Sequence, residues 1–176
     1  MMRRAGLALA IAILVLASGT AQAQRGVRVF SASLVPDQEV PAVASPARGF
    51  FIARVNTQQK TIDYVLSYDG LQADVRQAHI HFGQPNVNGG IVVWLCTTPQ
   101  ITTAPAGTQT CPQSGTITGL ATAQDVQAVT TQGINAGDID DVLAAIRNGQ
   151  AYANVHTVGS PGGEIRGKIN ADSGRR

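Results

Sequence analysis

The chain has 176 residues, of which 44% are hydrophobic and 14% are charged, and 13 Lys and Arg against 11 Asp and Glu give a formal net charge of +2. This length favours one domain that buries a hydrophobic core, and the low charge with ordinary apolar content excludes a disordered protein. The small net charge, without a cluster of Lys and Arg, argues against nucleic acid as a partner.

The first 23 residues have the pattern of a secretory signal peptide. Arg3 and Arg4 form a basic start, an apolar run covers residues 5–17, and Ala-Gln-Ala at 21–23 is a small-residue cleavage site. The apolar run is too short to span a membrane, which makes an uncleaved anchor the weaker alternative. We therefore expect a mature chain of residues 24–176 with 11 basic and 11 acidic residues. It is predicted to be exported to the periplasm or secreted, without a membrane span.

Alternation of apolar and polar residues predicts strands through the first half of the mature chain. Within 61–68, the residues Ile62, Tyr64 and Leu66 fall on one face. A short turn separates this segment from the strand before it, so the two are predicted to form a β-hairpin. The strands predicted in this part of the chain cover residues 27–35, 49–56, 61–68, 75–82 and 91–95.

Cys96 and Cys111 are the only cysteines, and they flank a loop rich in Thr, Pro and Gly. An even count in an exported protein predicts a disulfide, worth roughly 3 kcal/mol for a loop of this size in the chain-entropy model. Two thiolate ligands for a metal are the alternative, which the long spacing disfavours because it does not resemble a Cys-x-x-Cys clip.

After a further strand over 115–120, the pattern changes to that of helices. Thr122 is a candidate N-cap for a short helix ending near Val129. A second helix is predicted over 136–147, where apolar residues recur on one face at helical spacing: Ile139, Val142, Leu143 and Ile146.

Two closing strands are predicted over 152–156 and 164–169. The sequence therefore predicts one all-β domain over 24–176, with its core at about 27–170. The predicted fold is a Greek-key or immunoglobulin-like β-sandwich or barrel, with one or two short helices inserted late in the chain.

The chain has three histidines, and two of them are separated by one residue. His79 and His81 lie on a predicted strand, where residues i and i+2 share a face. His156 lies on another predicted strand, on the same face as Tyr152 and Asn154. If the two strands are neighbours, the three imidazoles can bind one metal ion, for which zinc or copper is suited. A shared ion requires nitrogens within ~4 Å of one another, about twice the ~2.1 Å bond.

Asn154, Glu164 and Arg166 are the polar residues expected to surround such a site and orient its ligands. The alternative for Asn154 is that it simply satisfies a histidine by a hydrogen bond. The alternative for Glu164 is an ion pair with Arg166, two residues further along the same strand, or with another neighbour. We find no convincing arrangement of catalytic residues, so we predict none.

Several stretches of the chain together match the pattern of one known family. They include Gln-Glu-Val-Pro at 38–41, Ile-Asp-Tyr-Val-Leu at 62–66, Ala-His-Ile-His-Phe-Gly at 78–83, the run 146–157 that contains Ala-Tyr-Ala-Asn-Val-His-Thr, and Pro-Gly-Gly-Glu-Ile-Arg-Gly at 161–167. With these stretches the sequence resembles the CHRD domain family, named for chordin, over about residues 27–170. The resemblance implies an exported all-β module, immunoglobulin-like or barrel-shaped, without a settled biochemical activity.

The segment at 79–83 is also similar to the His-Val-His strand of copper/zinc superoxide dismutase. By that resemblance His79, His81 and His156 are the copper ligands, and Arg166 is a candidate for the arginine near the copper. No histidine is left for a bridging ligand or a separate zinc site. The resemblance therefore supports a site for copper alone or for a metal in general.

Three functional hypotheses follow. The leading one is an exported binding module of the CHRD type that binds copper or zinc through the three histidines. The second is a module that interacts with a protein or matrix partner, in which the histidines only hold strands together by hydrogen bonds. The third, a superoxide-dismuting enzyme, has the least support, so a binding module is favoured over an enzyme.

Overall fold

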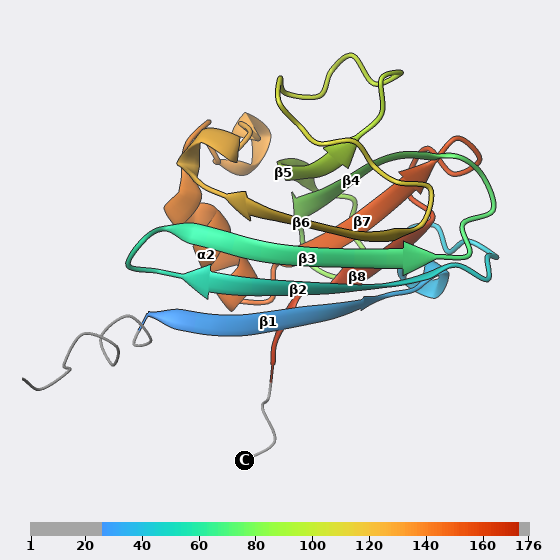
Figure 1. Ribbon diagram of the computed structural model, residues 1–176. Coiled ribbons are helices and arrows are strands. Elements are labelled where there is room, and N and C mark those ends of the chain that lie inside the picture. Colours follow the sequence, from blue (N-terminus) through green and yellow to red (C-terminus); the bar gives the residue numbers. More distant parts are fainter. Residues whose placement is uncertain (1–25, 173–176) are drawn as a thin grey trace, which may run out of the picture.

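The alternating segments of the sequence fold into two antiparallel sheets, described over residues 26–172 of the computed structural model (Figure 1). One sheet has the strand order β6-β3-β2-β1-β9 and the other has the order β5-β4-β7-β8. The strands are β1 Val27–Leu34, β2 Arg48–Asn56, β3 Thr61–Asp69, β4 Val75–Phe82, β5 Gly90–Thr97, β6 Gly115–Ala121, β7 Ala151–Thr157, β8 Ile165–Lys168 and β9 Asn170–Ala171. The predicted all-β sandwich is confirmed, and over these residues the sheets do not close into a barrel.

The predicted hairpin is formed by β2 and β3. The two strands pair over their whole length, from Asn56 opposite Thr61 to Arg48 opposite Asp69. The turn between them places Lys60 in the left-handed region, at φ 55°. This hairpin forms the middle of the five-stranded sheet, with β6 beside β3 and β1 beside β2.

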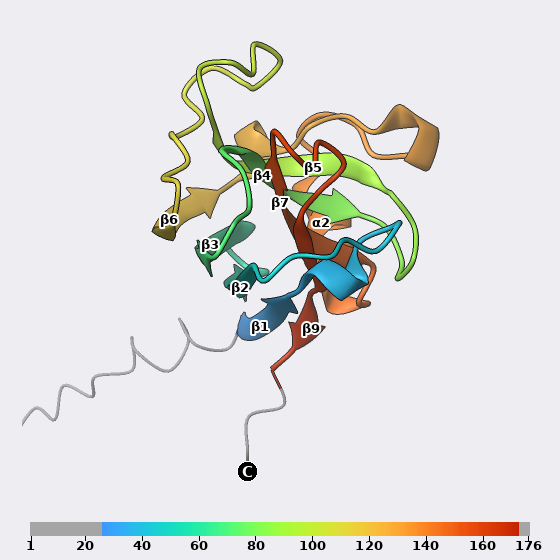
Figure 2. The ribbon, with the colours of Figure 1, turned by 90° about the vertical axis from the view of Figure 1, so that its right-hand side faces the viewer.

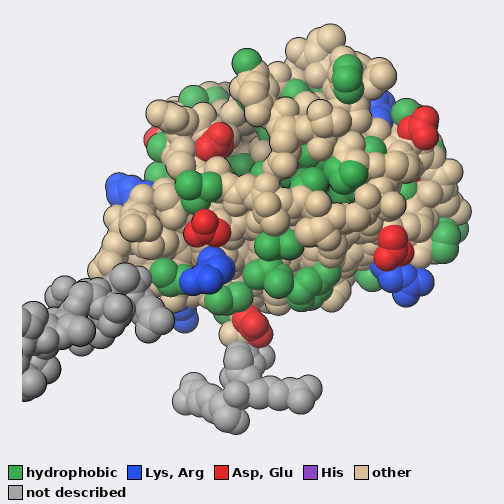
Figure 3. Space-filling view, viewed as in Figure 1, with side chains coloured by type: hydrophobic (Ala, Val, Ile, Leu, Met, Phe, Trp, Pro, Cys, Tyr) green, Lys and Arg blue, Asp and Glu red, His purple; other side chains and the backbone are tan. Residues whose placement is uncertain are grey.

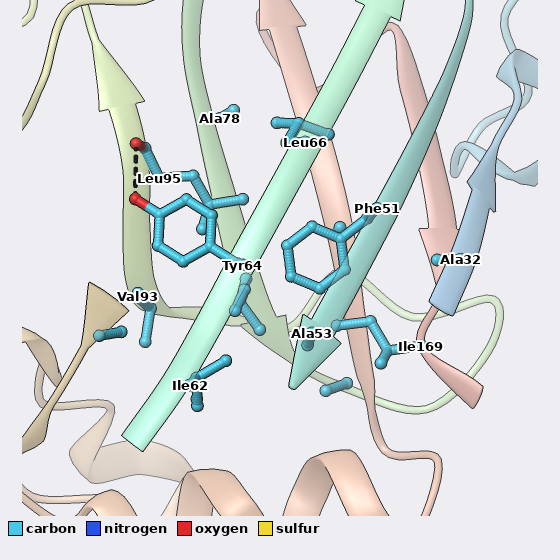
Figure 4. Packing of buried hydrophobic residues seen from close by; sticks show 14 of the residues in the cluster. Ala32, Phe51, Ala53, Ile62, Tyr64, Leu66, Ala78, Val93, Leu95 and Ile169 are labelled. Carbon is cyan, nitrogen blue, oxygen red and sulfur yellow. Dashed lines mark hydrogen bonds between the residues drawn. The ribbon is translucent and has the colours of Figure 1, made fainter. Parts of the chain in front are cut away.

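The core lies between the two sheets, which form separate layers in Figure 2. Phe51, Tyr64 and Leu66 enter it from the five-stranded sheet and are almost fully buried, as are Ala78 and Leu95 from the other sheet (Figure 4). The Tyr64 hydroxyl donates a hydrogen bond to the Leu95 carbonyl at 3.2 Å, which satisfies the one polar group of this ring.

Only the second predicted helix is an α-helix. Helix α2, Ile139–Arg147, buries the four apolar residues that the sequence pattern singled out, and Gly149 at φ 66° follows its end. The prediction of a helix from Thr122 to Val129 is wrong. This segment contains only one 3₁₀ turn, Ala123–Asp125, and a second such turn follows at Thr130–Gln132. The chain leaves the first turn because Gln127 donates its backbone N–H to Val92 of β5.

Cys96 and Cys111 form the predicted disulfide, which closes the loop after β5. Between residues 26 and 172, no helix is long and apolar enough to cross a membrane. The predicted signal peptide, residues 1–23, lies outside the described residues.

Candidate metal centre

Strands β4 and β7 are neighbours in the four-stranded sheet, which brings the three histidines together. His79 faces Asn154 across the strand pair, and His81 faces Tyr152. Their chain neighbours Ala78 and Ile80 point into the core and are fully buried. The histidines therefore lie on the face of this sheet that is turned away from the core.

The three imidazoles form one compact cluster. Their ring centroids are 5.0 Å apart for His79 and His156, 5.3 Å for His79 and His81, and 5.9 Å for His81 and His156. Nδ1 of His79 lies 3.3 Å from Nε2 of His156. Two nitrogens on one tetrahedral zinc lie about 3.3 Å apart, so this pair already has the required separation. One nitrogen can be chosen from each ring so that all three lie within 4.8 Å of one another. This distance is somewhat longer than the ~4 Å between nitrogens that a shared ion requires.

Backbone carbonyls fix the protonated nitrogen of two rings. Nδ1 of His81 lies 2.9 Å from the Gly89 carbonyl oxygen, and Nδ1 of His156 lies 2.9 Å from the Pro161 carbonyl oxygen. A carbonyl only accepts hydrogen bonds, so each Nδ1 carries the proton and each Nε2 presents a lone pair. Histidine ligands of metal ions have this second contact, which sets the tautomer and the direction of the ring.

The buried polar atoms without a partner are concentrated at this cluster. Among the described residues, three buried side-chain nitrogen or oxygen atoms have no hydrogen-bond partner: Nε2 of His79, Nε2 of His81 and Oδ1 of Asn154. His79 and Asn154 are opposite each other on β4 and β7, and His81 is two residues from His79. Nε2 of His81 and Oδ1 of Asn154 are acceptors. Nε2 of His79 is an acceptor when that ring is protonated at Nδ1, and it carries the proton when Nδ1 is the nitrogen that binds an ion.

The cluster holds its imidazoles in the neutral form. Burial lowers the pKa of His81 to about 3 and the pKa of His156 to about 4. The pKa of His79 is also well below its usual range because the ring is buried and lies beside the other two histidines. Neutral imidazole is the form that binds metal ions, so the cluster needs no deprotonation at neutral pH.

Aromatic side chains pack around the imidazoles. Trp94 of β5 meets His79 edge to face, with centroids 4.3 Å apart, and Tyr152 stacks on His81 at 4.7 Å. The Arg166 guanidinium lies 4.6 Å from the centre of the Tyr152 ring. These contacts restrict the rotation of His79 and His81. They also place Trp94, the only tryptophan of the chain, in direct contact with the cluster.

Arg166 is part of a buried ion pair that fixes one of the covering loops. Its Nε donates to Glu39 at 2.7 Å, and the Asn154 side-chain amide donates to the other oxygen of Glu39 at 2.6 Å. Its Nη2 donates to the Asn88 side chain at 2.7 Å. Burial raises the pKa of Glu39, and the nearby Arg166 charge acts against that shift. Arg166 therefore pairs with Glu39, not with Glu164, and it holds the loop that carries Gly89.

Glu164 fixes the other loop. Its carboxylate accepts hydrogen bonds from the Ser45 hydroxyl at 2.7 Å, the Gln72 backbone at 2.8 Å and the Thr157 hydroxyl at 2.7 Å. The Thr157 hydroxyl in turn accepts from the Ser160 backbone N–H at 3.1 Å, next to Pro161. Glu164 and Arg166 thus do not contact a histidine nitrogen, but each shapes a loop whose carbonyl does.

The three histidines predicted from the sequence are brought together, but the two backbone carbonyls that contact them directly were not predicted. His79, His81 and His156 form the only group of His, Cys, Asp or Glu among residues 26–172 with suitable spacing for a metal ion. Both cysteines are in the disulfide, which removes the alternative of thiolate ligands. The carbonyls of Gly89 and Pro161 were not predicted, because no side-chain pattern signals them.

The family model of the CHRD domain matches residues 30–169, a range that includes the three histidines and the disulfide. The resemblance to the CHRD family is confirmed. Neither a curated protein nor a solved structure is significantly similar to the chain.

Proposed function

Because the chain belongs to the CHRD domain family, which supports a role as a binding module, we propose that it is an exported protein that binds one copper or zinc ion through His79, His81 and His156. The observation that carries the proposal is the concentration of unpartnered buried polar atoms at one place. A buried polar atom without a partner costs about 1–3 kcal/mol, and a metal ion relieves that cost for the nitrogens that bind it.

The chemistry of the cluster favours these two metals. It offers imidazole nitrogens without a thiolate or a carboxylate among the ligands. Calcium and magnesium prefer oxygen ligands, whereas imidazole suits zinc and copper. Three protein ligands leave a position open on a four-coordinate ion. The unpartnered Asn154 oxygen, held by the contact of its amide with Glu39, is suited to accept a hydrogen bond from a water molecule in that position.

Arg166 and Glu164 have an indirect role in this proposal. Arg166 holds the loop that supplies the Gly89 carbonyl to His81, and Glu164 shapes the loop that supplies the Pro161 carbonyl to His156. Both are positioning residues, since they set the tautomers of two ligands through the backbone.

Trp94 makes metal binding measurable in the unmodified protein. Its ring touches His79, so copper(II) in the cluster quenches the fluorescence of the only tryptophan, and zinc competes with that quenching. We expect titration calorimetry of the metal-free mature chain to give one ion per chain. Replacement of His79 and His81 by alanine should weaken binding at least 100-fold, whereas Gln100→Ala, in the exposed turn after β5, serves as a control without effect.

A measurement on the wild-type chain makes the test independent of whether the variants fold. On zinc binding, the nitrogen resonances of Nε2 in His81 and His156 should shift while both Nδ1 atoms stay protonated. Unchanged imidazole spectra at saturating zinc, or unchanged affinity in a folded double-alanine variant, contradict the metal site.

The competing hypothesis is an interaction module for a protein or matrix partner, in which the histidines are structural. It is favoured by the close approach of His79 and His156, which can link β4 to β7 by a hydrogen bond. That hypothesis predicts no metal affinity and a marked loss of stability of the metal-free chain on His156→Ala. Export is tested separately: the exported protein should begin at Gln24, and a mature N-terminus at Met1 contradicts the proposed signal peptide.

A further inference from the structure

The outer face of the five-stranded sheet, opposite the side that packs on the core, carries exposed apolar side chains. Six large hydrophobic residues are exposed among residues 26–172, and four of them lie on this face: Val29 (40% exposed), Phe50 (43%), Val65 (37%) and Leu120 (55%). Scattered single residues of this kind need no explanation, but a group on one face marks an interaction surface.

Charged residues lie at the two ends of this face and not in its middle. Arg48 is opposite Asp69 at one end, and Arg54 is opposite Asp63 at the other. All four are exposed. Figure 3 shows this face with a red and a blue side chain at each end and green side chains between them. Both arginines belong to β2 and both aspartates to β3, so each strand carries one sign of charge.

We propose that this face binds the same face of a second copy of the chain, around a two-fold axis that runs parallel to the strands between β2 and β3. That rotation lays β2 of one copy over β3 of the other without a shift along the strands. Arg48 then meets Asp69 of the partner subunit, and Arg54 meets Asp63 of the partner subunit. A two-fold interface repeats each contact, so four ion pairs form at the ends of the face.

The apolar residues match under the same rotation. Ile52 of β2 and Val65 of β3 are opposite each other within one subunit. The rotation therefore brings Ile52 onto Val65 of the partner subunit, and Val65 onto Ile52 of the partner subunit. Val29 and Leu120 flank Arg54 and Asp63 in the row across β1, β2, β3 and β6, and the rotation places Val29 and Leu120 of the two subunits face to face as well. In this one arrangement, the charges and the apolar residues of the face are therefore complementary to those of a second copy. A partner with a uniformly basic or uniformly acidic surface would not match them.

The twist of packed sheets is compatible with these contacts. Aligned sheets pack at about 30° to each other. The charged pairs lie about 10 Å from the middle of the strands, at about 3.3 Å per residue, so the twist displaces them by about 5 Å. The long Arg side chains can span that displacement.

A charge-exchange experiment on the full mature chain tests the arrangement. Arg48→Asp with Arg54→Asp makes the ends of the face wholly acidic, and Asp63→Arg with Asp69→Arg makes them wholly basic. We expect the wild type to sediment as a dimer and each variant alone to dimerise at least tenfold more weakly. An equimolar mixture of the two variants should recover dimers, because only the contacts between subunits become complementary while those within each subunit stay repulsive.

The apolar contacts are tested by Val65→Glu, which should also dissociate the dimer, with Val158→Glu in an exposed loop as a matched control that leaves it intact. A wild type that stays monomeric at about millimolar concentration overturns the proposal, and so do variants that dimerise as the wild type does or a mixture that stays monomeric. Metal binding is measured in the same samples. Because the histidines lie on the other sheet, the dimer can fail without affecting the metal site, and the reverse also holds.

Discussion

Mild acid should destabilise the metal-free protein because its three histidines are buried in the neutral form. The pKa is lowered to about 3 for His81 and to about 4 for His156, and it is well below the usual range for His79. In the unfolded chain each imidazole has a pKa of about 6.5. Between these values the unfolded chain binds more protons than the folded one. Stability is therefore fully present above about pH 6.5 and falls as the pH falls below it.

The size of the effect follows from the distance between the pH and the unfolded pKa. At pH 5, about 1.5 units below 6.5, each histidine that stays neutral in the folded state lowers the free energy of unfolding by about 2 kcal/mol. His81 and His156 together give a loss of about 4 kcal/mol, a large part of the 5–15 kcal/mol of a typical domain, and His79 adds to the loss in the same direction. Glu39 acts in the opposite direction, because its pKa is raised in the folded state, but it is one group against three.

Urea unfolding followed by circular dichroism measures this loss. Samples with a chelator at about pH 7.5 and about pH 5 give the metal-free values. At the higher pH, a second series with zinc should be more stable than the metal-free series. The gain should be about 2.7 kcal/mol when free zinc is 100 times its dissociation constant. A metal-free chain with the same free energy of unfolding at both pH values refutes the description of the histidines as neutral and buried.

Three further predictions concern the scaffold, and chemical denaturation measures each of them. Phe51→Ala should cost about 3–5 kcal/mol because the ring is fully buried. Phe50→Ala, its exposed chain neighbour on the proposed dimer face, should change the stability of the monomer, measured in dilute protein, by less than about 1 kcal/mol; equal losses would contradict the assignment of the two sheet faces. Gly163→Ala should cost at least about 2 kcal/mol, since the residue has φ 129° and an added Cβ would lie 2.6 Å from an oxygen of Glu39; a neutral change would contradict this packing. Reduction of the disulfide should cost roughly 3 kcal/mol, and an unchanged unfolding midpoint would contradict a stabilising role.

The strand pattern and the histidine spacing could be predicted because both depend on short-range periodicity. Alternation of side chains puts His79 and His81 on one face whatever the rest of the chain does. The extent of the first helix could not be predicted in the same way. Thr122 does cap a turn, but Val126 pairs with Val93 of β5, so a contact with a distant strand decides how the chain continues.

The surroundings of the histidines depend on contacts between distant parts of the chain. Glu39 lies 127 residues before Arg166, and no local pattern indicates that the two form an ion pair. The Gly89 and Pro161 carbonyls are backbone atoms, so they are present at every residue and carry no signal in the sequence. The residues that hold the two loops, Glu164 among them, could be proposed as polar partners of the site but not assigned their contacts.

A purely structural role explains the histidine cluster less well than a metal site does. Hydrogen bonds to Gly89 and Pro161 satisfy one nitrogen of His81 and one of His156, and the contact between His79 and His156 can satisfy two more. Nε2 of His79, Nε2 of His81 and the Asn154 oxygen still have no partner, at a cost of about 1–3 kcal/mol each. Apolar residues of similar size would avoid that cost and hold the two strands equally well, since the ladder of backbone hydrogen bonds already joins β4 to β7. A cation between the rings would offset this cost, because lone pairs of the imidazoles would then become its ligands.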